Sequence, residues 1–131
     1  MARMLALAAS LTALTLDIAP ASSQEKDAGE DAGQVAFNTH CRNCHSTKPS
    51  DNRLGPTLHG IFGAKAGQVQ GFGGYSGSLT PDLVWDEATL DKFITNPDSV
   101  ASGTTMKPFP GVADAEERKK IVDFLKTAKG S

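Results

Sequence analysis

The sequence predicts a small all-α protein with a single folded domain. At 131 residues the chain has room for one domain and not for two. Apolar side chains recur at helical spacing in residues 86–94 and 114–129, whereas no part of residues 49–77 alternates long enough to indicate a strand. Hydrophobic residues make up 39% of the chain and charged residues 21%, a composition typical of globular proteins.

The segment that comes first, residues 1–23, has the pattern of a cleaved signal peptide. Arg3 provides the positive charge, Leu5–Leu16 the apolar run, and Ala19–Ala21 the small residues of a cleavage site. A membrane anchor needs about 17–25 apolar residues, and this run is shorter. We therefore expect residues 24–131 to form an exported domain with no permanent membrane anchor.

The first helix of the domain is expected at residues 33–40. The preceding residues 24–31 are polar, and we expect them to fray. Residues 49–77 are rich in glycine and in turn-forming residues, which predicts a long loop. The expected apolar anchors of this loop are Leu54, Leu58, Ile61 and Phe62.

Two further helices are expected in the second half of the chain. Asp86 is a suitable N-cap for the first of them, and Asn96–Pro97 would end it. The second should run from Asp114 to Lys129, with acidic residues in its first turn and lysines near its end, as the helix dipole favours. The residues expected to be buried on these helices are Leu90, Phe93, Ile94, Ile121, Val122, Phe124 and Leu125.

The charge and the cysteine content exclude two classes of protein. A formal net charge of −2 argues against a nucleic-acid-binding protein, which would carry a basic face. Two cysteines are too few for a disulfide-rich scaffold. A domain this small and rich in loops is of the kind that a bound cofactor stabilises.

The chemistry of the chain is expected at Cys41-Arg42-Asn43-Cys44-His45. The pattern Cys-x-x-Cys-His is the attachment signature of c-type haem. Two thiols three positions apart at a helix end can form thioethers with the two vinyl groups of one porphyrin, and the adjacent imidazole then lies under the iron. The motif predicts one haem c, bound covalently through Cys41 and Cys44, with His45 as an iron ligand.

Three other interpretations use the same cysteines. A thioredoxin-like redox pair would need a βαβ context, which this helical, glycine-rich chain lacks. A structural zinc site would need a fourth ligand from His40 or His59. A disulfide between Cys41 and Cys44 is the simplest alternative.

The second axial position on the iron decides what such a haem does. Met106 is the only methionine outside the expected signal peptide, and it lies in a loop stiffened by prolines. Its neighbours are turn-forming and polar, which weakens the alternative that it fills the core. His40 is too close to the motif to reach the opposite haem face easily, so His59 is the rival ligand.

These motifs resemble those of the class I cytochromes c of the mitochondrial type, a family that includes short exported bacterial electron carriers. The resemblance covers residues 33–126. It includes Gly33 and Phe37, the haem motif, Gly55-Pro56-Thr57-Leu58-His59-Gly60-Ile61-Phe62-Gly63, Trp85, Asn96–Pro97 and Gly103-Thr104-Thr105-Met106. It implies the family's small all-α fold, wrapped around one covalent haem.

The resemblance also implies a role for each remaining site residue. The carbonyl of Pro56 would accept a hydrogen bond from His45 and so orient its ring. Met106 would be the second axial ligand. Trp85 and Tyr75 would bind the haem propionates.

Some positions depart from the family pattern. Ala64 stands where the family often has an arginine near a propionate, and Pro108 looks like an insertion after the methionine. The mitochondrial relatives carry a ring of lysines around the haem edge. This chain offers only scattered basic residues there, namely Lys48, Lys65 and Lys107, which predicts weak electrostatic steering.

The resemblance implies an exported, monomeric electron carrier of the bacterial periplasm rather than an enzyme. Its haem would cycle between Fe(II) and Fe(III), with His45 and Met106 as axial ligands. Its partners would be larger redox proteins, such as a dehydrogenase, a reductase, an oxidase or a photosynthetic complex. Two alternatives stay open: a haem-based sensor in which Met106 does not bind, and a haem domain that works as a subunit of an oxidoreductase complex.

Overall fold

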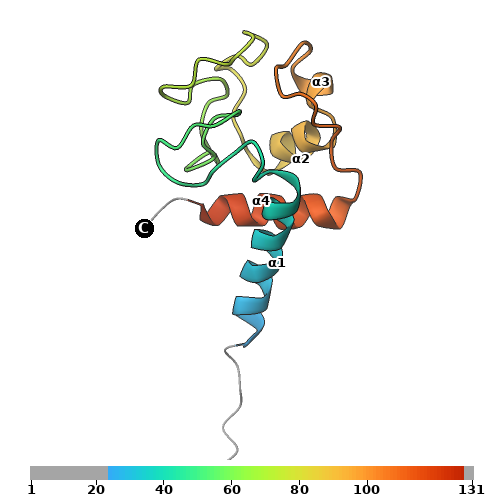
Figure 1. Cartoon of the computed structure of the whole chain (residues 1–131). Coiled ribbons are helices and arrows are strands. Elements are labelled where there is room, and N and C mark those ends of the chain that lie inside the picture. The colour runs from blue at the N-terminus through green and yellow to red at the C-terminus, as the bar shows by residue number, and fades with distance from the viewer. Residues whose placement is uncertain (1–23, 129–131) are drawn as a thin grey trace, which may run out of the picture.

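Residues 24–128 are the part of the chain that this computed structural model describes, and they contain four helices joined by long loops (Figure 1). The helices are α1 (Gln24–His40), α2 (Glu87–Thr95), α3 (Pro97–Val100) and α4 (Ala115–Thr127). Within the described residues, the β pairing is confined to one isolated bridge between Lys65 and Val84. The all-α prediction is confirmed. The signal peptide expected at residues 1–23 lies outside the described residues, as does Lys129.

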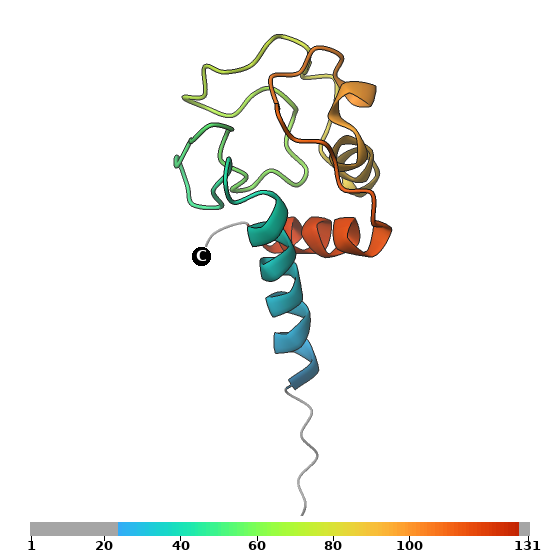
Figure 2. The same ribbon diagram turned by 45° about the vertical axis from the view of Figure 1, so that its right-hand side comes forward.

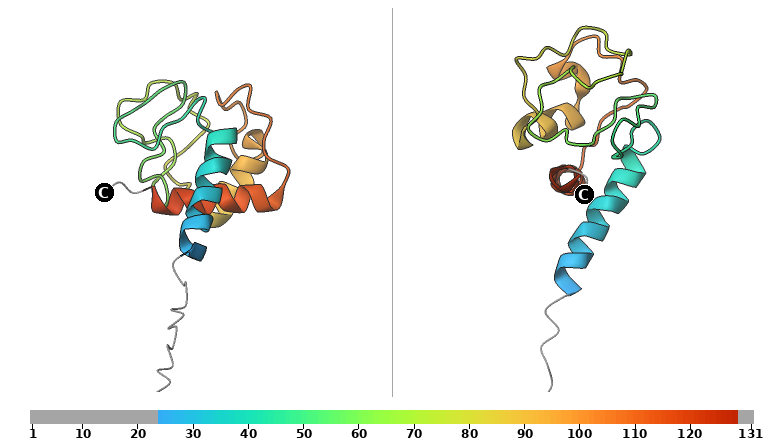
Figure 3. Two further views of the ribbon diagram at one scale, coloured as in Figure 1. Left: turned by 60° about the horizontal axis from the view of Figure 1, so that its bottom comes forward. Right: turned by 90° about the vertical axis from the view of Figure 1, so that its left-hand side faces the viewer.

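Helix α1 lies across α4, and the two helices touch at a glycine. Figures 2 and 3 show α1 crossing α4 at a steep angle. A Cβ atom on Gly33 would come within 2.9 Å of the Cβ of Phe124, so only glycine allows this approach. Beyond the crossing, the rings of Phe37 and Phe124 pack with their centroids 5.2 Å apart.

The prediction that residues 24–31 fray is wrong, because α1 begins at Gln24. These residues contain no proline, and their helix continues from the turn that Gly33 places against α4. Extending an existing helix costs much less free energy than starting one. The helix that is packed against α4 can therefore propagate through the polar residues before it.

Helix α2 begins at its predicted cap, Asp86, and α4 begins one residue after the predicted start at Asp114. The Asp86 carboxylate accepts the backbone N–H of Thr89, and the Thr89 hydroxyl lies 2.9 Å from the Asp86 backbone N–H, which completes a capping box. Asp114 caps α4 by accepting the backbone N–H of Glu117. Pro97 ends α2 as predicted, but it also occupies the first turn of the short helix α3, which the sequence analysis did not anticipate.

The core lies where α1, α2 and α4 meet the loops. The predicted apolar residues of α2 and α4 are buried, except that Phe124 is only half-buried. Within residues 24–128, no helix combines the length and the apolar character that a membrane crossing requires.

Three of the four predicted loop anchors pack in or against the core. Ile61 is buried, and Leu58 and Phe62 pack against the core. Leu54 is 82% exposed and lies outside this core, but it lines the cavity described below. It occupies a tight turn, in which the backbone N–H of Arg53 donates to the carbonyl of Gly55.

Candidate functional site

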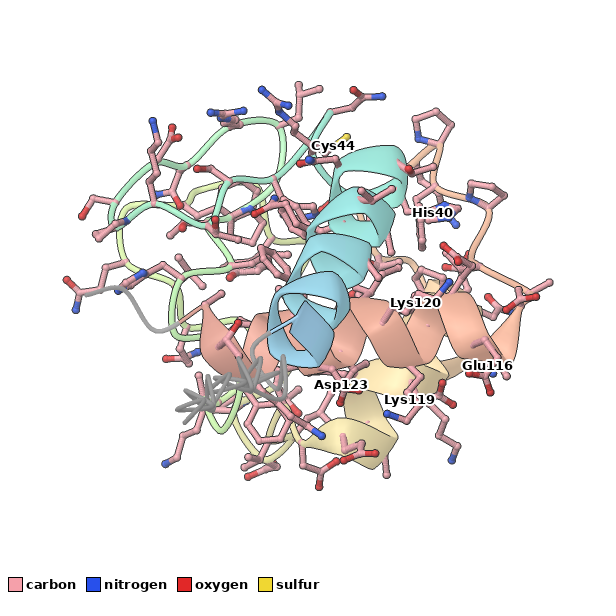
Figure 4. The ribbon with its side chains drawn as sticks, turned by 90° about the horizontal axis from the view of Figure 1, so that it is seen from below. His40, Cys44, Glu116, Lys119, Lys120 and Asp123 are labelled. Carbon is pink, nitrogen blue, oxygen red and sulfur yellow. The ribbon has the colours of Figure 1, made fainter. Side chains whose placement is uncertain are left out.

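The cysteine motif continues the last turn of α1. The backbone N–H groups of Cys41 and His45 donate to the carbonyls of Phe37 and Cys41, so the motif is wound in helix-like turns. Figure 4 shows His40 and Cys44 at the end of α1 that meets the loops. This winding brings Cys41, Cys44 and His45 to the wall of one cavity.

The ring of His45 is held by the carbonyl of Pro56. Its Nδ1 lies 2.7 Å from that oxygen. A carbonyl only accepts hydrogen bonds, so Nδ1 carries the proton and Nε2 keeps its lone pair. Burial lowers the pKa of His45, and the Pro56 hydrogen bond opposes this shift without reversing it. The ring is therefore neutral at pH 7, which is the form that binds a metal.

Gly55 gives the histidine ring the room it occupies. A Cβ atom at this position would lie 2.2 Å from Cε1 of His45. The backbone N–H of Gly55 also donates to the carbonyl of Cys44, so the loop packs directly against the motif. In the sequence, Gly55 stood out only as part of the segment around Pro56, and its place directly before that proline was the available signal.

The cavity has a volume of about 440 Å³, which is within the range of small-molecule and cofactor sites. Its lining comes from the motif after α1, from α2 and α4, and from the loops that lie above the crossing of α1 and α4 in Figure 1. The structure brings all the predicted site residues to its wall: Cys41, Cys44, His45, Pro56, Tyr75, Trp85 and Met106. Most of the other lining residues are apolar, among them Leu58, Ile61, Leu79, Leu90, Phe93, Ile94, Phe109, Ile121 and Leu125.

The two thiols are free, which contradicts the disulfide alternative. Burial, together with the nearby Cys44, raises the pKa of the Cys41 thiol to about 12. A thiol that stays protonated is a poor redox nucleophile, because this role needs the thiolate. Among the described residues, moreover, no three side chains of His, Cys, Asp or Glu lie close enough together to hold a metal ion.

The structure separates the two rivals for the second axial position. Met106 is half-buried and lines the same cavity as His45. The side chain of His59 turns the other way, with its Nδ1 3.3 Å from the carbonyl of Thr47, and it lines a separate pocket of about 280 Å³. His40 does line the main cavity, but its Nε2 lies 3.8 Å from the Glu117 carboxylate on α4.

Two hydrogen bonds hold the loop that contains Met106. The Thr105 hydroxyl donates to the carbonyl of Gly74, which belongs to the loop on the opposite side, at 2.7 Å. The Thr104 hydroxyl is buried and accepts the backbone N–H of Met106 at 3.3 Å. These two contacts restrict the directions that the methionine side chain can take.

Trp85 and Tyr75 present polar groups at an otherwise apolar wall. Trp85 is 4% exposed and packs on Phe93, with ring centroids 4.9 Å apart. No residue among 24–128 accepts a hydrogen bond from the indole N–H of Trp85. Every fully buried side-chain N or O atom in these residues does have a partner, so the indole N–H is not fully buried. The indole N–H is thus still accessible. The hydroxyl of Tyr75 accepts the backbone N–H of Val69 at 3.3 Å, and burial raises its pKa.

These observations fit the haem that the motif predicts. The cavity is large and mostly apolar, both thiols are unpaired, and the only nitrogen of His45 without a hydrogen bond is Nε2. A large planar group with an apolar rim is the kind of ligand that such a wall would bury. His45 and Met106, the two predicted iron ligands, both line this cavity.

The comparisons with known proteins agree with this site. Residues 28–125 match the family model described as "Cytochrome C oxidase, cbb3-type, subunit III". Cytochrome c2 iso-2 of Magnetospirillum molischianum is 37% identical, over 70% of this chain and 93% of its own length. Cytochrome c2 of Rhodoblastus acidophilus is 39% identical, over 76% and 92%. The structure of cytochrome cH from Methylobacterium extorquens superposes with a TM-score of 0.66 at 38% identity, covering 75% of this chain and 97% of that one. On this evidence the chain belongs to the class I cytochromes c, the electron-transfer proteins that carry a covalent haem c.

Proposed function

We propose that this chain is an exported, monomeric electron carrier in which His45 and Met106 are the axial ligands of the haem. Cys41 and Cys44 are the attachment points of its two thioethers. The bound haem supplies a one-electron couple, Fe(II)/Fe(III), and the chain supplies the ligands and the low-dielectric surroundings. The single observation that carries the proposal is that His45 and Met106 line one cavity, whereas His59 lines another.

The two ligands contribute differently to the couple. The Pro56 carbonyl keeps the proton of His45 on Nδ1, which orients the ring and increases the basicity of Nε2. The thioether of Met106 is a soft, neutral donor that stabilises Fe(II) relative to Fe(III), so we expect a fairly positive reduction potential. With both axial positions taken, the iron has no site for a substrate.

Trp85 and Tyr75 are our candidates for binding the haem propionates. The indole N–H of Trp85 is the better supported, because it is accessible and has no hydrogen-bond acceptor among the described residues. The Tyr75 hydroxyl already accepts a backbone N–H and keeps its own proton to donate.

Replacing Met106 with alanine tests the ligand pair. The wild-type ferric protein should show the weak absorption band at the red end of the visible spectrum that reports Met–Fe(III) ligation. The variant should lose this band, show a much lower potential and gain affinity for carbon monoxide. It should keep its haem, because the thioethers hold the haem independently of Met106.

His59→Ala is the matched control. It should leave the spectrum and the potential unchanged, because His59 lines the other pocket. If Met106→Ala keeps the wild-type spectrum while His59→Ala changes it, the second ligand is His59. A wild-type protein without the red band would instead support the haem-based sensor.

Export is tested on the native protein. We expect the mature N-terminus to fall between about Ser22 and Lys26, so intact mass and N-terminal sequencing should find a chain that has lost about its first 21 to 25 residues. A haem-loaded, membrane-bound protein that retains Met1 would contradict export with cleavage.

A subunit role is the second candidate, and the description of the matching family model favours it, since that description names an oxidase subunit. Purification from native membranes and periplasm separates the two functions. A free carrier should be recovered alone as a monomer, whereas a subunit should co-purify in fixed ratio with a larger redox protein.

A further inference from the structure

One half-buried side chain, Asn52, bridges two loops beside the haem cavity. Its Nδ2 donates to the carbonyl of Gln70 at 3.0 Å. Its Oδ1 accepts the backbone N–H of Thr57 at 2.9 Å. Gly71 lies so close that a Cβ there would be 3.4 Å from this Nδ2. Asn52 does not itself line the cavity, so its contacts act on the backbone and not on the cofactor.

The hydrogen bond to Thr57 ends on the same peptide group that holds His45. The Thr57 N–H and the Pro56 carbonyl are the two polar groups of one planar peptide unit. Oδ1 of Asn52 therefore holds one side of this unit, and Nδ1 of His45 donates to the other side at 2.7 Å. Hydrogen bonds in such a chain polarise one another, so each strengthens the next.

The position of this peptide unit depends on side chains because it belongs to a loop. No helix or strand orients it. The residues around it are held by the Gly55 N–H, which donates to the Cys44 carbonyl at 2.8 Å, by the Thr57 hydroxyl, which donates to the Lys48 carbonyl at 2.7 Å, and by the Leu58 N–H, which donates to the Ser46 carbonyl. Apart from His45 itself, Asn52 is the one described side chain that bonds a polar group of the unit and thereby restrains its tilt.

We propose that Asn52 is a positioning residue for the axial histidine, acting through the Pro56–Thr57 peptide to fix and strengthen the hydrogen bond at Nδ1 of His45. This inference rests on the proposed function, in which His45 is an iron ligand. A stronger hydrogen bond gives Nε2 more electron density, and this stabilises Fe(III) relative to Fe(II). Asn52 thus lowers the reduction potential without touching the haem.

The first test is Asn52→Leu, which keeps the approximate volume and removes both hydrogen bonds. In the reduced, haem-loaded protein we expect the Nδ1–H of His45 and the amide of Thr57 to exchange faster with solvent, as measured by NMR. The potential should rise, because the equilibrium shifts toward Fe(II) by up to about tenfold. For a one-electron couple, tenfold corresponds to about 59 mV. The red band of Met–Fe(III) ligation should be retained.

The second test, Asn52→Asp, keeps the acceptor for Thr57 and removes the donor to Gln70. If the peptide unit transmits the effect, the Nδ1–H of His45 should exchange no faster than in wild type, because a carboxylate accepts at least as strongly as an amide. If Asn52 acts only by tying the two loops together, this variant should behave like Asn52→Leu. This comparison with wild type also decides the proposal if Asn52→Leu does not fold.

Thr89→Ala is the control for a general loss of stability. The side-chain hydrogen bonds of Thr89 all lie within residues 84–89, so this variant should leave the potential and the Nδ1–H exchange unchanged. Faster exchange of the Thr57 amide in Asn52→Leu, with an unchanged potential and an unchanged Nδ1–H, would overturn the inference while leaving the His45–Met106 ligation intact. Failure of that ligation would appear in the wild-type spectrum instead.

Discussion

Replacing Gly55 with alanine should displace the ring of His45 and destabilise the protein. The added methyl group would lie 2.2 Å from Cε1, 2.7 Å from Nδ1 and 2.8 Å from Nε2 of His45. Ordinary carbon–carbon contacts are about 3.5–4.0 Å long, so the ring would have to move by roughly 1 Å or more. It cannot do so freely, because its Nδ1 is bonded to the Pro56 carbonyl at 2.7 Å.

The expected cost combines overpacking with a weakened hydrogen bond of a buried donor. Each of these effects costs about 1–3 kcal/mol in other proteins, so we expect a loss of about 2–6 kcal/mol in the free energy of unfolding. That is a large part of the stability of a small domain, which is about 5–15 kcal/mol. The visible spectrum should also change, because the proposed iron ligand is turned.

Equilibrium denaturation of the haem-loaded protein in guanidinium chloride measures this loss, and Gly73→Ala is the matched control. A Cβ on Gly73 would meet no atom within 4 Å, and its backbone is not left-handed, so alanine there should be neutral or stabilise by about 0.4–1 kcal/mol. If Gly55→Ala unfolds at the same midpoint as wild type with the same spectrum, the ring of His45 is not held against residue 55 and the reasoning is refuted.

Three further predictions concern the helices and the surface. Arg118→Met should lower the free energy of unfolding by about 1–3 kcal/mol. The Arg118 side chain is only 12% exposed, and it donates to the Asp91 carboxylate and to the carbonyls of Val112 and Ala113. A urea titration that finds a loss of less than about 0.5 kcal/mol would contradict this prediction. Asp86→Asn should make stability less sensitive to acid: the Thr89 N–H and hydroxyl hold the pKa of Asp86 below its usual value, so its contribution is complete above the unfolded pKa of about 3.9 and is lost as the pH falls through the lower folded pKa. Equal slopes of stability against pH below pH 4 in both proteins would show that the cap does not titrate in this way. Electron transfer with the native partner should slow only modestly with salt, because Lys107 is paired with Asp98 and Lys65 lines the second pocket; a steep loss in stopped-flow rates between low and physiological ionic strength would reveal a basic patch.

The features that the sequence by itself determined are local ones. The cap at Asp86, the start of α4 next to Asp114 and the buried faces of α2 and α4 were predicted correctly, because capping and helical periodicity act between residues three or four positions apart. The haem motif was readable for the same reason, since its chemistry depends on the spacing of Cys41, Cys44 and His45 within one turn. A single short segment contains all that these inferences require.

The tertiary structure alone decided what the loops do. The sequence favoured Met106 as the second ligand but left His59 as a rival, and only the folded chain places the first at the cavity of His45 and the second at another pocket. The same holds for Leu54, which lies outside the core but lines the cavity, and for Asn52, whose partners come from two different loops. Loop side chains take their directions from turns and from contacts between distant parts of the chain, and neither leaves a periodic trace in the order of the residues.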